Sequence, residues 1–375
     1  MSELMNSSSS RGGFRRQLLT SVSALALLGL VCAAVEPAAA DEGNDYPTVW
    51  IELGGQLERM DGGQTPFAPP FFDAVTKGGF ESPLEAGRPS IYSNGAEGAI
   101  SFTPDNSDWV FSASVRYGRS NGHRFLHQQF KSLATPGVFT PTKNKYAPPN
   151  FAQTKADNSE AHLIADFQAG KDVGLGLFGG ESTSVLSAGV RFAQFNAKSD
   201  ATIRARPDAH FVIKSASGFK IPLDQYHQYY ASAQRAVSFR GFGPSISWKA
   251  SAALSGNPRD GEIALDWGAN AAILFGRQKA KTHHHSTGNY HYRNGFAPVT
   301  AQLTPHTGTS DRSHSVVAPN LGAFAGLSFR FDRAKVSVGY RGDFFFGAMD
   351  GGLNTHKSYN QEFYGPFATV SIGLP

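Results

Sequence analysis

The feature that most constrains the fold is a regular alternation of apolar with other side chains between Pro319 and Phe346. Every second residue from Leu321 to Phe331 is apolar, and after Asp332-Arg333-Ala334 the alternation resumes as far as Phe346. Side chains of a β-strand point alternately to the two faces of its sheet. This stretch therefore predicts a β-hairpin with one apolar face.

The other face of this hairpin does not resemble the solvent-exposed side of a soluble sheet. Small residues are mixed on it with Phe324 and with the charged residues Arg330, Arg341 and Asp343. That mixture is typical of a crowded polar interior, and an apolar outside around a polar interior is the pattern of a membrane-spanning barrel. We therefore predict an all-β fold, an antiparallel transmembrane β-barrel.

The same alternation recurs along the chain and predicts about ten strands, within limits of eight and twelve. The predicted strands fall near residues 49–58, 96–102, 109–117, 161–169, 186–192, 229–254, 263–276, 321–331, 336–346 and 368–374. Long loops are predicted at residues 59–94, 119–160, 193–225, 279–315 and 348–363. An even count places both termini and the short turns on the periplasmic side, with all the long loops on the extracellular side.

One predicted strand, residues 229–254, contains a phase slip. The apolar residues before Gly241-Phe242-Gly243-Pro244 share one phase, and those after it share the other. A turn there would move every later long loop to the opposite side of the membrane. A β-bulge inserts one residue and favours Gly, so we predict a single strand with a bulge at Gly241 to Gly243.

The first 40 residues are predicted to be a signal peptide. Arginines precede the apolar run from Leu18 to Ala34, and Ala38-Ala39-Ala40 is a small-residue cleavage pattern. Arg15-Arg16 resembles a twin-arginine signal, but that route exports folded proteins, so we interpret the segment as a Sec-type signal cleaved near Ala40. The mature chain, residues 41–375, is predicted to be one outer-membrane barrel domain.

Composition excludes several classes of function. Cys32 is the only cysteine and is lost with the signal peptide, so no disulfide or zinc–cysteine site is expected, and no cofactor motif is present. Cleavage removes three Arg and two Glu and lowers the formal charge from +4 to +3. So mild a charge does not favour a nucleic-acid partner.

The candidate functional residues are polar side chains predicted to line the lumen. They are Glu52, Glu97, Arg116, Asp166, Arg191, Lys249, Asp266, Asn270, Arg330, Arg341 and Asp343. Their charges nearly balance, which leaves two interpretations: an ion-pair network that fills the lumen, or charges that line a water-filled conduit. Small barrels are more often filled.

Two further residue patterns are weaker. His283, His284, His285 and His291 crowd into one predicted loop, which fits a metal site, a pH-sensitive loop or a solvated polar loop. Some ten-stranded outer-membrane barrels are proteases with Asp and His at the rim. The residues that could form such a site here are Asp200, Asp208, His210, His227, Asp311 and His314. No Gly-x-Ser-x-Gly motif stands out, and we expect no enzymatic activity.

Three stretches carry a resemblance to a known family. They are Phe239-Arg-Gly-Phe-Gly-Pro-Ser-Ile-Ser-Trp248, Asn270-Ala-Ala-Ile-Leu-Phe-Gly276 and Phe363-Tyr-Gly-Pro-Phe-Ala-Thr-Val-Ser-Ile-Gly-Leu374. With them the chain from about Asp166 resembles the Legionella-type major outer-membrane proteins, which form pores. Leu374-Pro375 departs from the terminal aromatic that is usual in barrels.

The resemblance implies a porin-like role. We therefore expect a narrow channel for ions or small solutes in the cell outer membrane, in contact with outer-membrane lipid and lipopolysaccharide. The alternative is a structural or surface-adhesion barrel whose loops bind partners. The sequence gives no indication of an oligomeric state.

Overall fold

The computed structural model describes residues 49–62, 92–105, 107–130, 150–173, 183–206, 208–214, 220–257, 260–294, 297–302, 306–352 and 355–374. These residues belong to one compact unit, Thr48–Pro375, and the predicted signal peptide lies outside them. They form twelve β-strands. The strands are β1 (Val49–Gly62), β2 (Tyr92–Phe102), β3 (Trp109–Phe130), β4 (Asn150–Asp172), β5 (Thr183–Arg206), β6 (Asp208–Lys214), β7 (Lys220–Asn257), β8 (Gly261–Asn294), β9 (Ala297–Gln302), β10 (His306–Phe331), β11 (Ala334–Asp350) and β12 (Ser358–Leu374).

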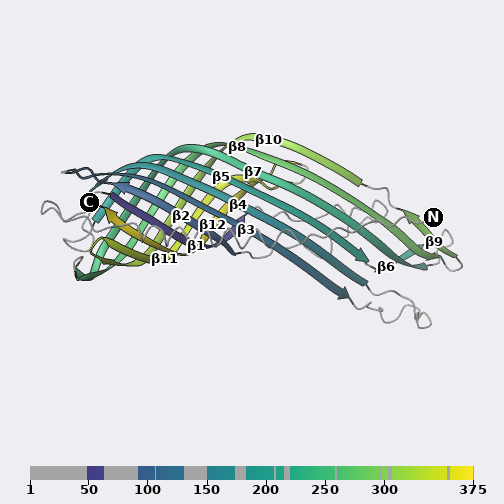
Figure 1. Ribbon diagram of the computed structural model, residues 1–375. Coiled ribbons are helices and arrows are strands. Elements are labelled where there is room, and N and C mark those ends of the chain that lie inside the picture. Colours follow the sequence, from purple (N-terminus) through teal and green to yellow (C-terminus); the bar gives the residue numbers. More distant parts are fainter. Residues whose placement is uncertain are drawn as a thin grey trace, which may run out of the picture. The chain divides into compact units, whose positions relative to one another are not determined.

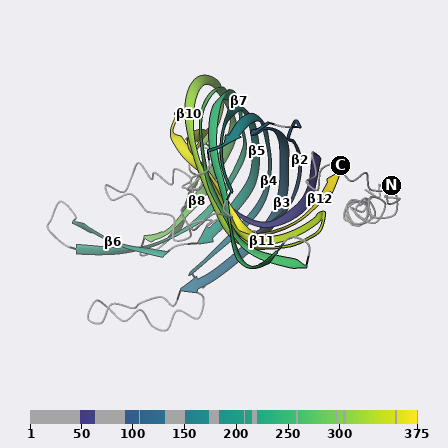
Figure 2. The same ribbon diagram turned by 90° about the vertical axis from the view of Figure 1, so that its left-hand side faces the viewer.

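Ten of these strands close into an antiparallel barrel (Figures 1 and 2). The ring order is β1-β2-β3-β4-β5-β7-β8-β10-β11-β12, and β12 pairs back with β1. The short strands β6 and β9 add to the outer ends of β7 and β8 and lie outside the ring. The predicted all-β fold with ten antiparallel strands is confirmed.

Within the described residues, no helix is long and apolar enough to cross a bilayer.

Tight connections join consecutive strands at one end of the barrel, which we call the short-turn end. The turn between β10 and β11 contains only Asp332 and Arg333, and Asp332 has a φ of 52°. Asp tolerates this left-handed conformation, which tight hairpin turns require. Both ends of the barrel sequence, Val49 and Leu374, pair with each other at this same end. This arrangement matches the predicted separation of short turns from long connections.

An apolar band surrounds the barrel on its outer face. Many large apolar side chains in it are more than a third exposed. They include Ile100, Phe111, Val115, Tyr117, Phe167, Leu186, Val190, Phe242, Ile246, Ile263, Ile273, Phe275, Val317, Leu321, Leu327, Phe329, Val336, Val338 and Tyr340. A continuous apolar surface of this extent is rare on a soluble monomer, and it is what a barrel presents to lipid. We conclude that the barrel spans a membrane.

Ile273 provides a test of this facing. It is 49% exposed in the middle of the apolar band, so Ile273→Arg is expected to destabilise the barrel by about 2–4 kcal/mol. His283→Arg is the matched control, since His283 is exposed on the same face of β8 beyond the band and should tolerate the change. Urea unfolding in lipid vesicles measures both. Equal stability of the two variants would show that the band does not face lipid.

The strands are longer than predicted, and the predicted long loops are correspondingly too long. β3 continues to Phe130 and β4 begins at Asn150, inside the predicted loop 119–160. β8 continues to Asn294, well into the predicted loop 279–315. A membrane crossing needs only about 9–11 residues per strand. Beyond the bilayer the outward side chains meet water, so the apolar alternation disappears although the backbone ladder continues.

The predicted bulge at Gly241 to Gly243 is wrong, although the prediction of a single strand there is right. β7 pairs with β5 in unbroken register from Ser251 to Tyr229. The register shift of β7 lies against β8, between Ala253 and Ser255. What changes near Gly241 is the face that carries the apolar residues: Phe239 is buried inside the barrel, whereas Phe242 is exposed outside.

Candidate functional site in the barrel lumen

The middle of the lumen contains a layer of paired charges, which we call the charged layer. Nη1 of Arg116 on β3 lies 2.6 Å from Oδ2 of Asp343 on β11. On the neighbouring strands β5 and β4, Arg191 contacts Asp166 through two nitrogens, at 2.6 and 2.9 Å. The Asp343 and Arg191 side chains are buried. Buried charges are tolerated when they are paired and hydrogen-bonded in this way.

Further contacts extend the charged layer across the barrel. Arg341 on β11 forms an ion pair with Glu97 on β2, and its guanidinium lies 4.7 Å from the ring centre of Phe367. Arg191 also donates to the side-chain oxygens of Asn270 on β8, at 2.6 Å, and of Asn320 on β10. These contacts therefore connect strands from opposite sides of the ring.

Glycine creates the space for this network at one position. An added Cβ on Gly322 would lie 2.3 Å from Oδ1 of Asp343 and 2.6 Å from Nδ2 of Asn270. Any larger residue at Gly322 would displace one of these two side chains. The small residues of the inner face thus leave room for the long charged ones.

The other predicted lumen residues lie nearer the short-turn end. Asp266 accepts a hydrogen bond from Ser251 at 2.6 Å and pairs with Lys335 at 2.7 Å. Glu52 accepts a hydrogen bond from Ser371, Arg330 stacks over Trp50, and Lys249 is exposed. The eleven predicted positions therefore divide into two groups. Glu97, Arg116, Asp166, Arg191, Asn270, Arg341 and Asp343 form the charged layer, and Glu52, Lys249, Asp266 and Arg330 lie below it.

A second layer fills the lumen on the side of the long connections. It consists of Phe195, Phe239, Phe345 and Phe363, which we call the aromatic layer. Ring centres of Phe195 lie 5.5 Å from Phe239, 4.7 Å from Phe345 and 5.3 Å from Phe363, so β5 contacts β11 and β12 through the lumen. The four rings are at most 2% exposed. Met60, Ile164, Leu274, Ala318 and Met349 belong to the same buried cluster.

The alternation pattern of the sequence does not predict the aromatic layer. Phe195 lies in the predicted loop 193–225, and Val237 and Phe239 lie in the predicted strand 229–254 on the phase that precedes the slip. The signal that could have revealed them is the phase slip near Gly241. It marks the height at which apolar residues leave the lipid-facing side of the wall and occupy the inside.

A polar cluster ties three strands together above the aromatic layer. Arg312 on β10 contacts both carboxylate oxygens of Asp350 at the end of β11, at 2.5 and 3.0 Å. Arg235 on β7 donates to the backbone oxygen of Asp350. Burial alone would raise the pKa of Asp350, but the hydrogen bonds from Arg312 and from backbone N–H groups outweigh burial and leave the pKa below its usual value.

The depressed pKa of Asp350 predicts a pH dependence of stability. A carboxylate with a lowered folded-state pKa stabilises the fold above its unfolded-state pKa, and this contribution is lost as the pH falls through the folded-state pKa. Asp350→Asn should therefore destabilise the barrel at pH 7, and by less at about pH 3, below the unfolded-state pKa. Urea midpoints at the two pH values measure this. A difference that persists unchanged at low pH would contradict the assignment.

The histidines of the predicted metal or pH-sensitive loop lie on β8. His283 and His285 point outward and lie within hydrogen-bond distance of Thr309 and Thr307, at 3.0 and 2.8 Å, whereas His284 is buried inside. Consecutive strand residues face opposite sides, so these three rings do not converge. Over the described part of the chain, no three His, Cys, Asp or Glu side chains are grouped to hold a metal ion.

The residues considered for a protease-like rim are scattered. Asp311 pairs with Lys281 at 3.0 Å on the outer face, Asp200 is exposed on β5, and the ring of His314 lies 4.6 Å from that of His356. For Asp208, His210 and His227 the structure describes the backbone only. The described members of this set do not form a catalytic arrangement of acid, base and nucleophile.

These features define a ten-stranded membrane-spanning β-barrel whose lumen is filled by two layers of side chains. No protein-family model matches the chain, and no curated protein matches it. Solved structures similar to it are barrels of very different sequence.

Three of these structures illustrate the similarity. The outer membrane protease OmpT from Escherichia coli is 10% identical over 89% of this chain and 99% of its own, with a TM-score of 0.35. The translocator domain of autotransporter NalP from Neisseria meningitidis is 12% identical over 94% and 97%, with a TM-score of 0.23. The toluene transporter TodX from P. putida is 10% identical over 88% and 90%, with a TM-score of 0.20. Likeness at this level assigns no activity to the chain.

Proposed function

We propose that the chain is an outer-membrane β-barrel with a closed lumen that acts at the cell surface as a structural or adhesive protein. The observation that carries the proposal is the aromatic layer, in which Phe195 meets Phe345 and Phe363 from the opposite side of the ring. A dry layer of rings does not pass hydrated ions. The charged layer obstructs the same lumen a second time, because its ion pairs reach across it from β11 to β2 and β3.

The outer membrane is the proposed location. A closed barrel satisfies all backbone hydrogen bonds within lipid, and short turns at one end with long connections at the other are typical of bacterial outer-membrane barrels. The predicted signal peptide supports export to this membrane. The outer part of the wall, formed by the long strands β3, β4, β5, β7, β8 and β10, would then face the outside and carry any contact with external partners.

A second candidate is a narrow porin-like channel for ions or small solutes. It is supported by the resemblance of the chain from about Asp166 to the Legionella-type major outer-membrane proteins. The charged layer also favours it, since paired charges of both signs would become wet if the aromatic layer moved. A channel of this kind should have low conductance and weak ion selectivity.

Planar-bilayer recordings of the refolded protein separate the two candidates. The closed-lumen proposal predicts no conductance steps from correctly folded protein, with folding checked by the heat-sensitive gel mobility of the barrel. Small steps with weak selectivity would favour the narrow channel. Large steps typical of general porins would contradict both the closed lumen and the narrow channel.

A further inference from the structure

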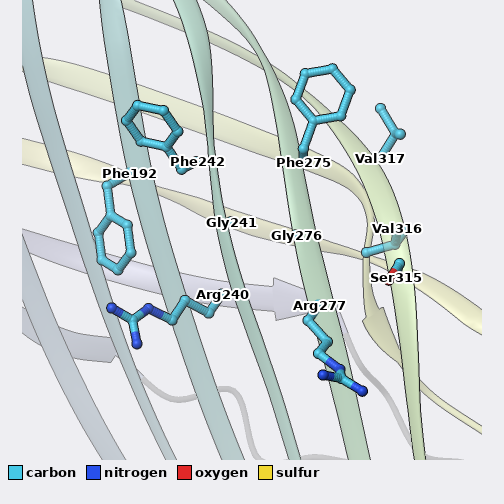
Figure 3. A pocket seen from close by; sticks show the side chains of 10 residues that line it. All are labelled: Phe192, Arg240, Gly241, Phe242, Phe275, Gly276, Arg277, Ser315, Val316 and Val317. Carbon is cyan, nitrogen blue, oxygen red and sulfur yellow. The ribbon is translucent and has the colours of Figure 1, made fainter.

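An open groove of about 780 Å³ lies on the outer face of the barrel, over β5, β7, β8 and β10. Figure 3 shows three phenylalanine rings on one side of this groove and two guanidinium groups on the other. The register explains the arrangement, because Phe192, Phe242, Phe275 and Val317 form one continuous row across the four strands. This row is the last apolar row of the lipid-facing band on these strands.

The next row outward is basic and polar. It consists of Gln194, Arg240, Arg277 and Ser315, and the row after it of Asn196, Ser238, Lys279 and Ser313. Arg240 and Arg277 are direct cross-strand partners on the same face. Like charges placed directly opposite each other destabilise a sheet, and a neutralising anion would remove this cost.

No protein carboxylate supplies that anion within the described residues. Basic side chains farther out on the same surface do have acidic neighbours, since Lys281 pairs with Asp311 at 3.0 Å and Lys155 with Asp157 at 3.5 Å. Neither of the two groove rows contains an acidic residue. The lumen arginines 116, 191, 312 and 341 are likewise each paired with a carboxylate. In the described part of the chain, the facing pair Arg240 and Arg277 therefore lacks the carboxylate partners that these other cations have.

Neighbouring side chains hold the two guanidinium groups and turn them in opposite directions, that of Arg240 toward β5 and that of Arg277 toward β10. The guanidinium of Arg240 lies 5.3 Å from the ring centre of Phe192, and Nε of Arg277 donates to Oγ of Ser313 at 2.7 Å. These contacts leave the terminal nitrogens of Arg277 for a ligand. Arginine forks match phosphate oxygens geometrically, and the serine and amide groups of the two rows match sugar hydroxyls.

We infer that this groove binds the phosphorylated headgroup of an outer-leaflet glycolipid, with phosphate groups at the guanidinium groups of Arg240 and Arg277 and acyl chains along Phe192, Phe242 and Phe275. The inference rests on the proposed outer-membrane location. A lipid is the occupant that explains both halves of the groove, because a soluble phosphate would not use the exposed phenylalanines and a neutral lipid would not neutralise the arginines. Basic pockets at membrane surfaces recognise lipid headgroups through the same chemistry.

The test is lipid binding by the purified full-length barrel in neutral detergent micelles, measured by native mass spectrometry and by titration. Bis-phosphorylated lipid A should bind as one tightly held copy, and chemically dephosphorylated lipid A at least tenfold more weakly. Arg240→Gln combined with Arg277→Gln should reduce the affinity for the phosphorylated lipid at least tenfold. Inorganic phosphate at millimolar concentration should not displace the lipid.

The matched control is Arg59→Gln combined with Arg119→Gln. These two arginines come directly after the outward-facing apolar residues Leu57 and Tyr117, but they lie on β1 and β3, which are not neighbours. The control should keep the parent affinity. Equal affinity of the groove variant and the parent, equal losses in both double variants, or displacement by inorganic phosphate would each overturn the inference. The assay does not measure conductance, so its failure is distinguishable from failure of the proposed function.

Discussion

Asp343→Leu is expected to destabilise the folded barrel by about 3–5 kcal/mol, because it leaves a charged guanidinium buried without its partner. Arg116 contacts Asp343 at 2.6 Å, and the Asp343 side chain is only 1% exposed. Arg191 lies 4.0 Å from the other carboxylate oxygen, so a second cation loses a neighbouring anion. Equilibrium urea unfolding in lipid vesicles, followed by the fluorescence of the four tryptophans, measures the change.

Two further variants show whether the loss comes from an unpaired charge. Adding Arg116→Met to Asp343→Leu should recover a large part of the stability, since replacing both members of a buried pair with apolar residues is often nearly neutral. Asp311→Leu is the matched control on the outer wall, where the exposed pair with Lys281 contributes about 0–1 kcal/mol. If Asp343→Leu is no less stable than Asp311→Leu, the charged layer does not stabilise the barrel.

The membrane-spanning half of the fold could be predicted because lipid imposes a simple rule on one face of each strand. The β10–β11 hairpin follows this rule from Leu321 to Phe346, and its two-residue turn fixes the register. The rule applies only to the part of each strand that faces lipid. On β8 the outward residues change from Phe275 to Arg277 and Lys279, so a strand that continues to Asn294 looks like a polar loop in the sequence.

The composition of the charged layer was accessible from the sequence, but its pairing was not. Alternation shows that Arg341 and Glu97 face inward, whereas the distance between β11 and β2 across the lumen depends on ring closure and strand tilt. Register alone would pair Glu97 with Arg116, which lies directly opposite it on β3. In the structure Arg116 instead reaches Asp343 on the far side of the barrel.

The second large effect is expected in the aromatic layer. Phe345→Ala should destabilise the barrel by about 3–5 kcal/mol, because Phe345 is fully buried and its removal leaves a cavity between Phe195 and Phe363. The adjacent Phe344 is 39% exposed on the outer face. Phe344→Ala should cost less, since lipid chains can occupy the vacated space and no cavity forms. The same vesicle-based urea unfolding compares the two neighbouring positions.

The aromatic layer should also control the passage of ions. Phe195→Ala combined with Phe345→Ala removes two contacting rings from the layer, and we expect brief openings of small conductance that remain limited by the charged layer below. The control, Phe192→Ala combined with Phe344→Ala, removes two rings on the outer face of the same strands. Like the parent, it should show no conductance steps in planar bilayers. If the lumen variant folds correctly and also shows no conductance steps, the charged layer alone closes the barrel and the aromatic layer is not what blocks ions.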